Sequence, residues 1–159
     1  MPAVPLENNP SPIGGKMKIL IGIEDSIFSY NAARFVARRP WHSGTQVRLI
    51  SAVEMDPMSG YVELEKSMIY KRAGEVIDRA VAILLDGDAE FEITTKIAEG
   101  NPKHVILDEA EHWNPDIIVV GSHGRSGLGR FLLGSVSQAI ALHAPCSVEI
   151  VRAPPAQSA

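Results

Sequence analysis

The stretch Asp116-Ile-Ile-Val-Val-Gly121-Ser-His-Gly124-Arg-Ser-Gly127-Leu-Gly129-Arg-Phe-Leu-Leu-Gly134-Ser135 joins an apolar run of strand length to the start of a helix. Five of the chain's 13 glycines fall in the fourteen residues from Gly121 to Gly134. Average glycine usage would place roughly one there. Glycines between a buried strand and a helix let backbone N–H groups come close to an anion. The stretch therefore predicts a phosphate-binding loop.

The loop has a regular spacing, because Gly121, Gly124 and Gly134-Ser135 fit G-x-x-G-x9-G-[ST]. The first two glycines would let the turn expose its N–H groups, and the pair Gly134-Ser135 would place unpaired amides at a helix N-terminus. Further donors would be the Ser135 hydroxyl and the side chains of Arg125 and Arg130. The alternative is a flexible strand-to-helix connection in which Ser135 is only a helix cap. The loop is neither a Walker motif nor a dinucleotide fingerprint.

Strands and helices alternate along the chain. The apolar runs and turn signals predict strands at 17–23, 46–53, 91–97, 116–120 and 146–151, and helices at 29–39, 61–85, 102–113 and from 135 to before Pro145. Ser135-Val-Ser-Gln138 has the form of a capping box. The alternation predicts an α/β fold with a mostly parallel sheet and helices on both faces.

Ligands of such sheets bind beyond the carboxyl ends of the strands, where the strand order reverses. The turn Glu24-Asp25-Ser26 leaves the first predicted strand, and the Gly121 loop leaves the fourth. If these strands are neighbours, we expect both loops to line one crevice.

Length and composition indicate one domain between two short tails. The chain has 159 residues and a formal net charge of -4, which makes a nucleic-acid partner unexpected. We expect disordered tails at 1–15 and 153–159, because both are rich in proline or small residues and lack periodicity. Without a signal-peptide pattern or an apolar run of ~18 residues, we expect a cytoplasmic protein with no membrane partner.

The segment from Asp116 to Arg152 resembles the C-terminal half of a universal stress protein domain. The resemblance continues through Lys18-Ile-Leu-Ile-Gly-Ile-Glu-Asp-Ser26 and Ala98-Glu-Gly100-Asn-Pro102, and covers roughly residues 16–152. It implies a five-stranded parallel sheet of order 3-2-1-4-5, a Rossmann-like fold of the adenine nucleotide α-hydrolase type. It also implies a role in stress response or signalling. Members with the glycine spacing bind ATP or related adenine nucleotides (AMP, ADP or cAMP).

The resemblance also implies positions for the nucleotide. Phosphate contacts would come from Gly121, Gly124, Gly134, Ser135 and Val136, with Val120 beneath the ribose or α-phosphate. Backbone groups at the strand ends would come from Gly22, Ile23, Ala52 and Val53, the last two next to the adenine. Where the family usually has aspartate facing the ribose, this chain has Glu24 followed by Asp25. Either carboxylate could accept from a ribose hydroxyl, or both could be solvated.

Two further expectations concern the loop and its chemistry. His123 would donate to a phosphate when protonated, or it would be a solvated loop histidine. We find no activated serine and no base that would align a water, so we expect nucleotide binding rather than an enzyme. The alternatives are a nucleotide-free dimeric interaction module and a slow ATPase. Mg²⁺ or Mn²⁺ would arrive bound to the phosphates. The resemblance implies a homodimer through the edge strand Ser147-Val-Glu-Ile-Val151.

Overall fold

The computed structural model describes residues 16–56, 58, 60, 62–124 and 132–153. The predicted tail at 1–15 and all but Ala153 of the predicted tail at 153–159 lie outside the described residues. Arg125 and Arg130, two of the proposed phosphate donors, also lie outside them.

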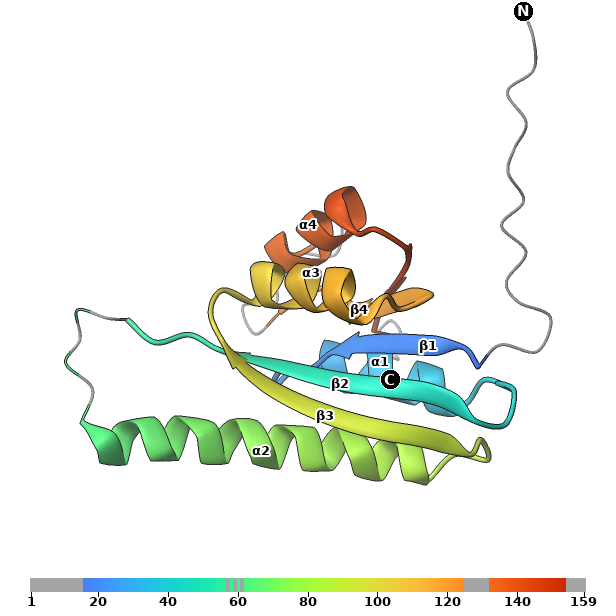
Figure 1. Cartoon of the computed structure of the whole chain (residues 1–159), viewed down its shortest axis with the longest axis horizontal. Helices are drawn as coiled ribbons and strands as arrows, with labels where there is room; N and C mark the ends of the chain where they lie inside the picture. Colours follow the sequence, from blue (N-terminus) through green and yellow to red (C-terminus); the bar gives the residue numbers. More distant parts are fainter. Residues whose placement is uncertain (1–15, 57, 59, 61, 125–131, 154–159) are drawn as a thin grey trace, which may run out of the picture.

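The centre of the fold is a five-stranded parallel sheet in the order β3-β2-β1-β4-β5, which confirms the expected topology (Figure 1). The strands are β1 (Lys18–Gly22), β2 (Thr45–Val53), β3 (Phe91–Glu99), β4 (Ile117–Gly121) and β5 (Ser147–Val151). Each lies within two residues of its predicted bounds at either end. Because β1 pairs with β2 on one side and β4 on the other, the strand order reverses between β1 and β4.

In the described part of the chain, four helices cover the two faces of this sheet (Figure 1). They are α1 (Ile27–Ala37), α2 (Glu63–Leu85), α3 (Pro102–Trp113) and α4 (Ser135–His143). The central strand, β1, contributes side chains to the cores on both faces of the sheet. Ile19 and Ile21 pack in the core beneath α1 and α2, and Leu20 packs in the core beneath α3 and α4. A strand covered on both faces must be apolar at every position, which explains the continuous run in β1.

Local signals set the starts of α1 and α3. The Asn101 side chain accepts a hydrogen bond from Lys103 N at 3.2 Å, and Pro102 takes the first helical position, as predicted. Helix α1 begins earlier than predicted, because Ser26 Oγ accepts from Ser29 N at 3.2 Å and so acts as the cap.

The start of α4 differs from the prediction. Gly134 is its N-cap in an extended conformation, and no described side chain caps this end. Ser135 is already the first helical residue, so the predicted capping box is wrong. The Gln138 side chain instead donates to Leu133 O at 3.3 Å. Glycine adopts this conformation without a side-chain bond, so the N-cap lies at Gly134 and the serine is the first residue of the helix.

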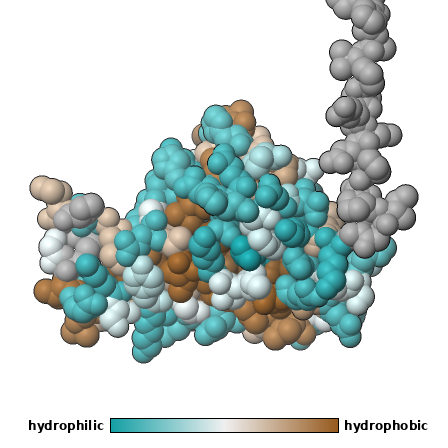
Figure 2. Space-filling view, in the orientation of Figure 1, coloured by the Kyte–Doolittle hydropathy of each residue, from teal (hydrophilic) through white to brown (hydrophobic). Residues whose placement is uncertain are grey.

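The first turns of α2 extend past the ends of the strands (Figure 1). Apolar side chains are exposed at this end of the molecule (Figure 2). They include Met58, Val62, Leu64 and Met68. Local signals support the helix here, since Glu65 accepts from Val62 N at 3.3 Å and the first turn carries two acidic residues. Within the described part of the chain, no helix combines the length and hydropathy of a bilayer span.

Candidate functional site

The loops that follow β1 and β4 meet at the point where the strand order reverses. A Cβ built on Gly124 would stand 3.1 Å from Glu24 Oε1. A Cβ built on Gly121 would stand 2.7 Å from Phe28 O, so the start of α1 lies directly against the end of β4. Both glycines are needed for these close approaches. The two loops therefore lie side by side at the point where the sequence predicted a shared crevice.

The base of the glycine-rich loop is closed by hydrogen bonds between its two ends. Gly134 N donates to Ser122 O at 2.8 Å. The buried Ser137 hydroxyl lies 3.0 Å from Ser122 O and 2.9 Å from Gly134 O. The Gly134 amide is therefore engaged here, and the helix-terminal donors available to an anion begin at Ser135 and Val136. With the positive end of the α4 dipole, these amides are suited to an anionic group.

The β1 loop is held by Ser29 in α1. Glu24 N donates to Ser29 Oγ at 2.9 Å, and the same hydroxyl donates back to Glu24 O at 2.9 Å. This pair of bonds fixes the backbone of Glu24, whose half-buried carboxylate faces Gly124. The sequence analysis gave Ser29 no role in the site.

The neighbouring carboxylate, Asp25, has different partners. Tyr30 Oη donates to Asp25 Oδ1 at 3.1 Å, and Arg79 Nη1 of α2 lies 3.5 Å from the same oxygen. Burial, followed by the hydrogen bond to Asp25, raises the pKa of Tyr30, so its hydroxyl stays a donor at neutral pH. Asp25 is thus engaged by α1 and α2, whereas Glu24 borders the glycine loop.

His123 packs beside this loop. Its Nδ1 lies 2.9 Å from Ser122 Oγ, and its ring lies against Phe28 with centroids 5.0 Å apart. The residue is half-buried, so part of its surface still meets solvent.

The carboxyl end of β2 presents backbone groups toward the crevice. Ile23 N donates to Ile50 O at 2.9 Å, so Ile50 faces the β1 side, whereas Val53 O accepts from Gly100 N at 3.0 Å on the β3 side. Alternate residues of a strand present their N–H and C=O groups to the same neighbour. Ala52 therefore faces the β1 side, beyond the Gly22–Ile50 pair where β1 ends. A donor and an acceptor at this position are suited to a flat heterocycle.

Several predicted site residues can offer only backbone. Ile23 and Val120 have buried side chains in the two cores, and Val136 packs against the core beneath α3 and α4. A Cβ on Gly22 would stand 2.7 Å from Ile106 Cδ1, which keeps this position free of a side chain. The backbone roles expected for Gly22, Ile23 and Val136, and the place of Val120 beneath the ribose or α-phosphate, stay predictions.

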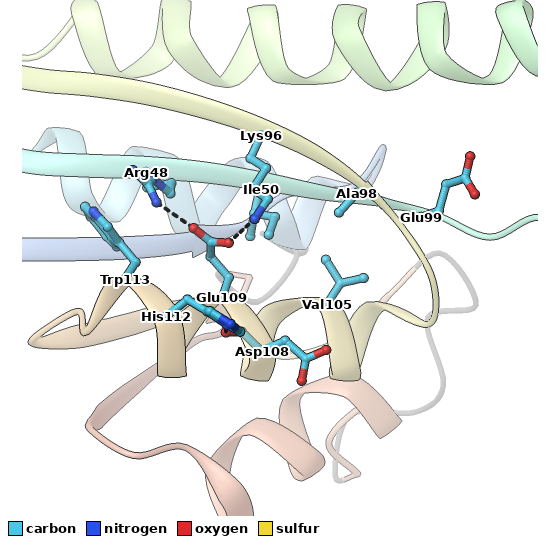
Figure 3. Close-up of a pocket in the computed structure, with 10 residues that line it drawn as sticks. All are labelled: Arg48, Ile50, Lys96, Ala98, Glu99, Val105, Asp108, Glu109, His112 and Trp113. Carbon is cyan, nitrogen blue, oxygen red and sulfur yellow. Dashed lines mark hydrogen bonds and ion pairs between the residues drawn. The ribbon is translucent and has the colours of Figure 1, made fainter.

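A separate cavity of about 450 Å³ lies between α3 and the strands β2 and β3 (Figure 3). Glu109 of α3, whose side chain is 3% exposed, bonds Arg48 Nη1 at 2.5 Å and also Lys96 Nζ (Figure 3). Burial works to raise the pKa of Glu109, but Lys96 and Arg48 outweigh it and hold the pKa below its ordinary value. This group ties α3 to the sheet.

The sequence analysis missed Glu109. The available signal was its place on the buried face of α3, at helical spacing from Val105 and Ile106. A carboxylate on such a face needs cationic partners.

The fold defines a class of protein: a Rossmann-like α/β protein whose β1 and β4 loops meet at the switch point of a 3-2-1-4-5 sheet. Residues 16–152 match the model of the universal stress protein family, and the chain belongs to that family. The Universal stress protein MJ0531 of Methanocaldococcus jannaschii is 29% identical over 142 residues, which cover 86% of this chain and 82% of the relative.

Solved structures share the fold. The hypothetical protein MJ0577 superposes with a TM-score of 0.73 at 26% identity, covering 87% of this chain and 97% of the other. The universal stress protein family protein At3g01520 of Arabidopsis thaliana, solved with AMP bound, gives a TM-score of 0.65 at 20% identity, covering 90% and 95%.

Proposed function

We propose that this chain binds an adenine nucleotide in the crevice between the β1 and β4 loops. ATP is the first candidate, and AMP, ADP and cAMP are the others. Binding, rather than turnover, would serve a cytoplasmic stress response or signalling role. The observation that carries the proposal is the approach of Glu24 to Gly124 beside the start of α4, which no described side chain caps.

The phosphates would lie against the start of α4. Donors there are the amides of Ser135 and Val136 and the Ser135 hydroxyl, at the positive end of the helix dipole. A Cβ on Gly134 would stand 3.3 Å from His123 Cα, so this turn is open only because both Gly124 and Gly134 lack side chains. Any Mg²⁺ or Mn²⁺ would be held mainly by the phosphates and water.

The ribose hydroxyls would donate to Glu24. Of the two adjacent carboxylates, Glu24 lies next to Gly124, whereas Asp25 accepts from Tyr30 and lies 3.5 Å from Arg79. The carboxylate of this longer side chain lies beside Gly124, and Ser29 holds the Glu24 backbone.

The adenine would pair with the backbone of Ala52. The N–H and C=O of this residue face the β1 side beyond the end of β1, whereas the carbonyl of Val53 is already bonded to Gly100. One donor and one acceptor match the edge of an adenine ring. The AMP bound to the Arabidopsis relative supports this ligand class.

We also propose a homodimer through β5. This strand is at the edge of the sheet, and its outer N–H and C=O groups have no strand partner among the described residues. A second copy related by a twofold axis would pair with it. Nucleotide occupancy would then bias the surface that partner proteins contact.

The test is equilibrium dialysis of the purified chain with labelled ATP, AMP and cAMP, together with mass spectrometry for nucleotide carried through purification. We expect saturable binding of at least one of them. Failure of all three to bind at millimolar concentration would favour the nucleotide-free interaction module. Phosphate release from ATP well above that of a Gly124→Val control would favour the slow ATPase.

A further inference from the structure

Ser29 and Ser137 occupy the same position in two different helices. Each is the third residue of its helix, α1 for Ser29 and α4 for Ser137. Those helices follow β1 and β4, the strands whose loops border the crevice. Both residues are buried, with 3% and 2% of their surface exposed. In both, the hydroxyl reaches back to the backbone of the loop that leads into the helix.

Ser29 closes a two-bond ring with a single residue. Its oxygen accepts from Glu24 N and donates to Glu24 O, both at 2.9 Å. The hydroxyl uses its proton and a lone pair on the backbone of one residue, so the backbone of Glu24 is held from within the helix.

Ser137 connects the two ends of the glycine-rich loop. Its hydroxyl lies within hydrogen-bond distance of Ser122 O and Gly134 O, at 3.0 and 2.9 Å. A single hydroxyl proton serves these two carbonyls in turn. Together with the bond from Gly134 N to Ser122 O, this joins the chain before and after the loop.

We propose that Ser29 and Ser137 are a matched pair of positioning residues that preset the two walls of the crevice before a ligand enters. The inference rests on the proposed nucleotide function and adds to it a regulation of affinity by residues that do not touch the nucleotide. If the loops are already ordered before the ligand binds, the binding free energy is not reduced by the cost of ordering them. Ser29 fixes the ribose side, and Ser137 fixes the phosphate side.

Thr45 offers a matched control. It is fully buried and its hydroxyl donates to a loop carbonyl, His42 O, at 2.7 Å. It lies at the first residue of β2, at the end of the sheet opposite the crevice. Removing this hydroxyl deletes a buried hydrogen bond to a loop of the same kind, but it leaves the β1 and β4 loops unchanged.

The experiment compares Ser29→Ala, Ser137→Ala and Thr45→Val with the wild-type chain. AMP and ATP affinities are measured by calorimetry, and the ligand-free melting temperature is recorded for each protein. We expect each serine variant to bind about fivefold to tenfold more weakly, as the loss of one buried hydrogen bond would give. Thr45→Val should keep the wild-type affinity while lowering the melting temperature. Ser137→Thr, which keeps the hydroxyl, should recover affinity.

The outcomes separate the two proposals. A wild-type chain that binds neither nucleotide refutes the proposed function itself. A wild-type chain that binds, with serine variants of unchanged affinity or a Thr45→Val variant that loses affinity equally, overturns only the positioning role.

A second measurement uses the wild-type chain alone, so the proposal can still be tested if the serine variants fail to fold. In the ligand-free wild-type chain, the amides of Glu24 and Gly134 should be protected from hydrogen exchange by their bonds to Ser29 and Ser122. Exchange at the rate of unprotected amides would overturn the idea of preset walls.

Discussion

Glu24 lies against Gly124, with 3.1 Å between Glu24 Oε1 and the place where a Cβ on Gly124 would stand. This close approach leaves little room for a side chain at position 124.

Gly124→Val should weaken AMP binding by about tenfold to a hundredfold, because the added side chain overpacks the entrance and displaces Glu24. Calorimetric titration measures the effect. The control is Gly74→Ala in α2, where an added Cβ meets nothing within 4 Å. That variant should gain about 0.5–1 kcal/mol in stability from helix propensity and keep its affinity. Equal affinities for Gly124→Val and wild type would place the ligand elsewhere.

Glu24→Ala should remove discrimination between AMP and its 2′,3′-dideoxy analogue. The wild-type chain should prefer AMP by about tenfold or more, the value of a hydrogen bond to a charged group. Asp25→Ala should keep that preference, because Asp25 is bonded to Tyr30 and Arg79 instead. Competition binding with the two nucleotides checks both variants, and loss of the preference in Asp25→Ala alone would reverse the assignment.

Glu109→Gln should destabilise the fold at neutral pH by about 1–3 kcal/mol, because it leaves Arg48 and Lys96 without their carboxylate. The folded pKa of Glu109 is lowered, so its contribution is present above the unfolded value of about 4.3 and is lost as pH falls through the folded pKa.

Urea unfolding between neutral pH and about pH 3 measures this effect. The stability gap between wild type and Glu109→Gln should narrow as the pH falls below about 4.3. Glu92→Gln, at an exposed pair with Lys16, should change stability little. A gap that widens on acidification would contradict the assigned pairing.

Val148→Pro should convert the proposed dimer to a monomer. Ser122 N donates to Val151 O, so alternate residues of β5 face β4, and Val148 presents its N–H to the outer edge. Proline there removes an outer donor without breaking the ladder to β4. Val148→Thr controls for the lost apolar packing and should stay dimeric. Sedimentation velocity decides the outcome, and a wild-type monomer would end the proposal.

The sequence predicted the elements well because each carries a local signal. The run Ile19-Leu20-Ile21 required a strand covered on both faces, and Asn101-Pro102 marked the start of α3. The order of the strands came from the family resemblance, since alternation of strands and helices fixes only the class. The N-cap of α4 was placed one residue late because Gly134 and Ser135 are adjacent cap candidates, and local rules favour the serine.

The parts of the site that escaped prediction depend on tertiary contacts. Glu109 meets Arg48, 61 positions away in sequence, and no local pattern indicates that pairing. The different roles of Glu24 and Asp25 likewise depend on Arg79 in α2 and Gly124 after β4. The meeting of the β1 and β4 loops was predictable, because the topology brings the carboxyl ends of these strands together.

Trp41 follows α1, where its Nε1 donates to Val36 O, and Trp113 ends α3, with Arg48 over its ring at 4.4 Å. These are the two tryptophans of the chain, and both precede strands and so lie at the amino end of the sheet, remote from the crevice. Tryptophan fluorescence should therefore report unfolding of the chain, but it should not change when nucleotide is added. An optical assay of occupancy will need a fluorophore on the ligand.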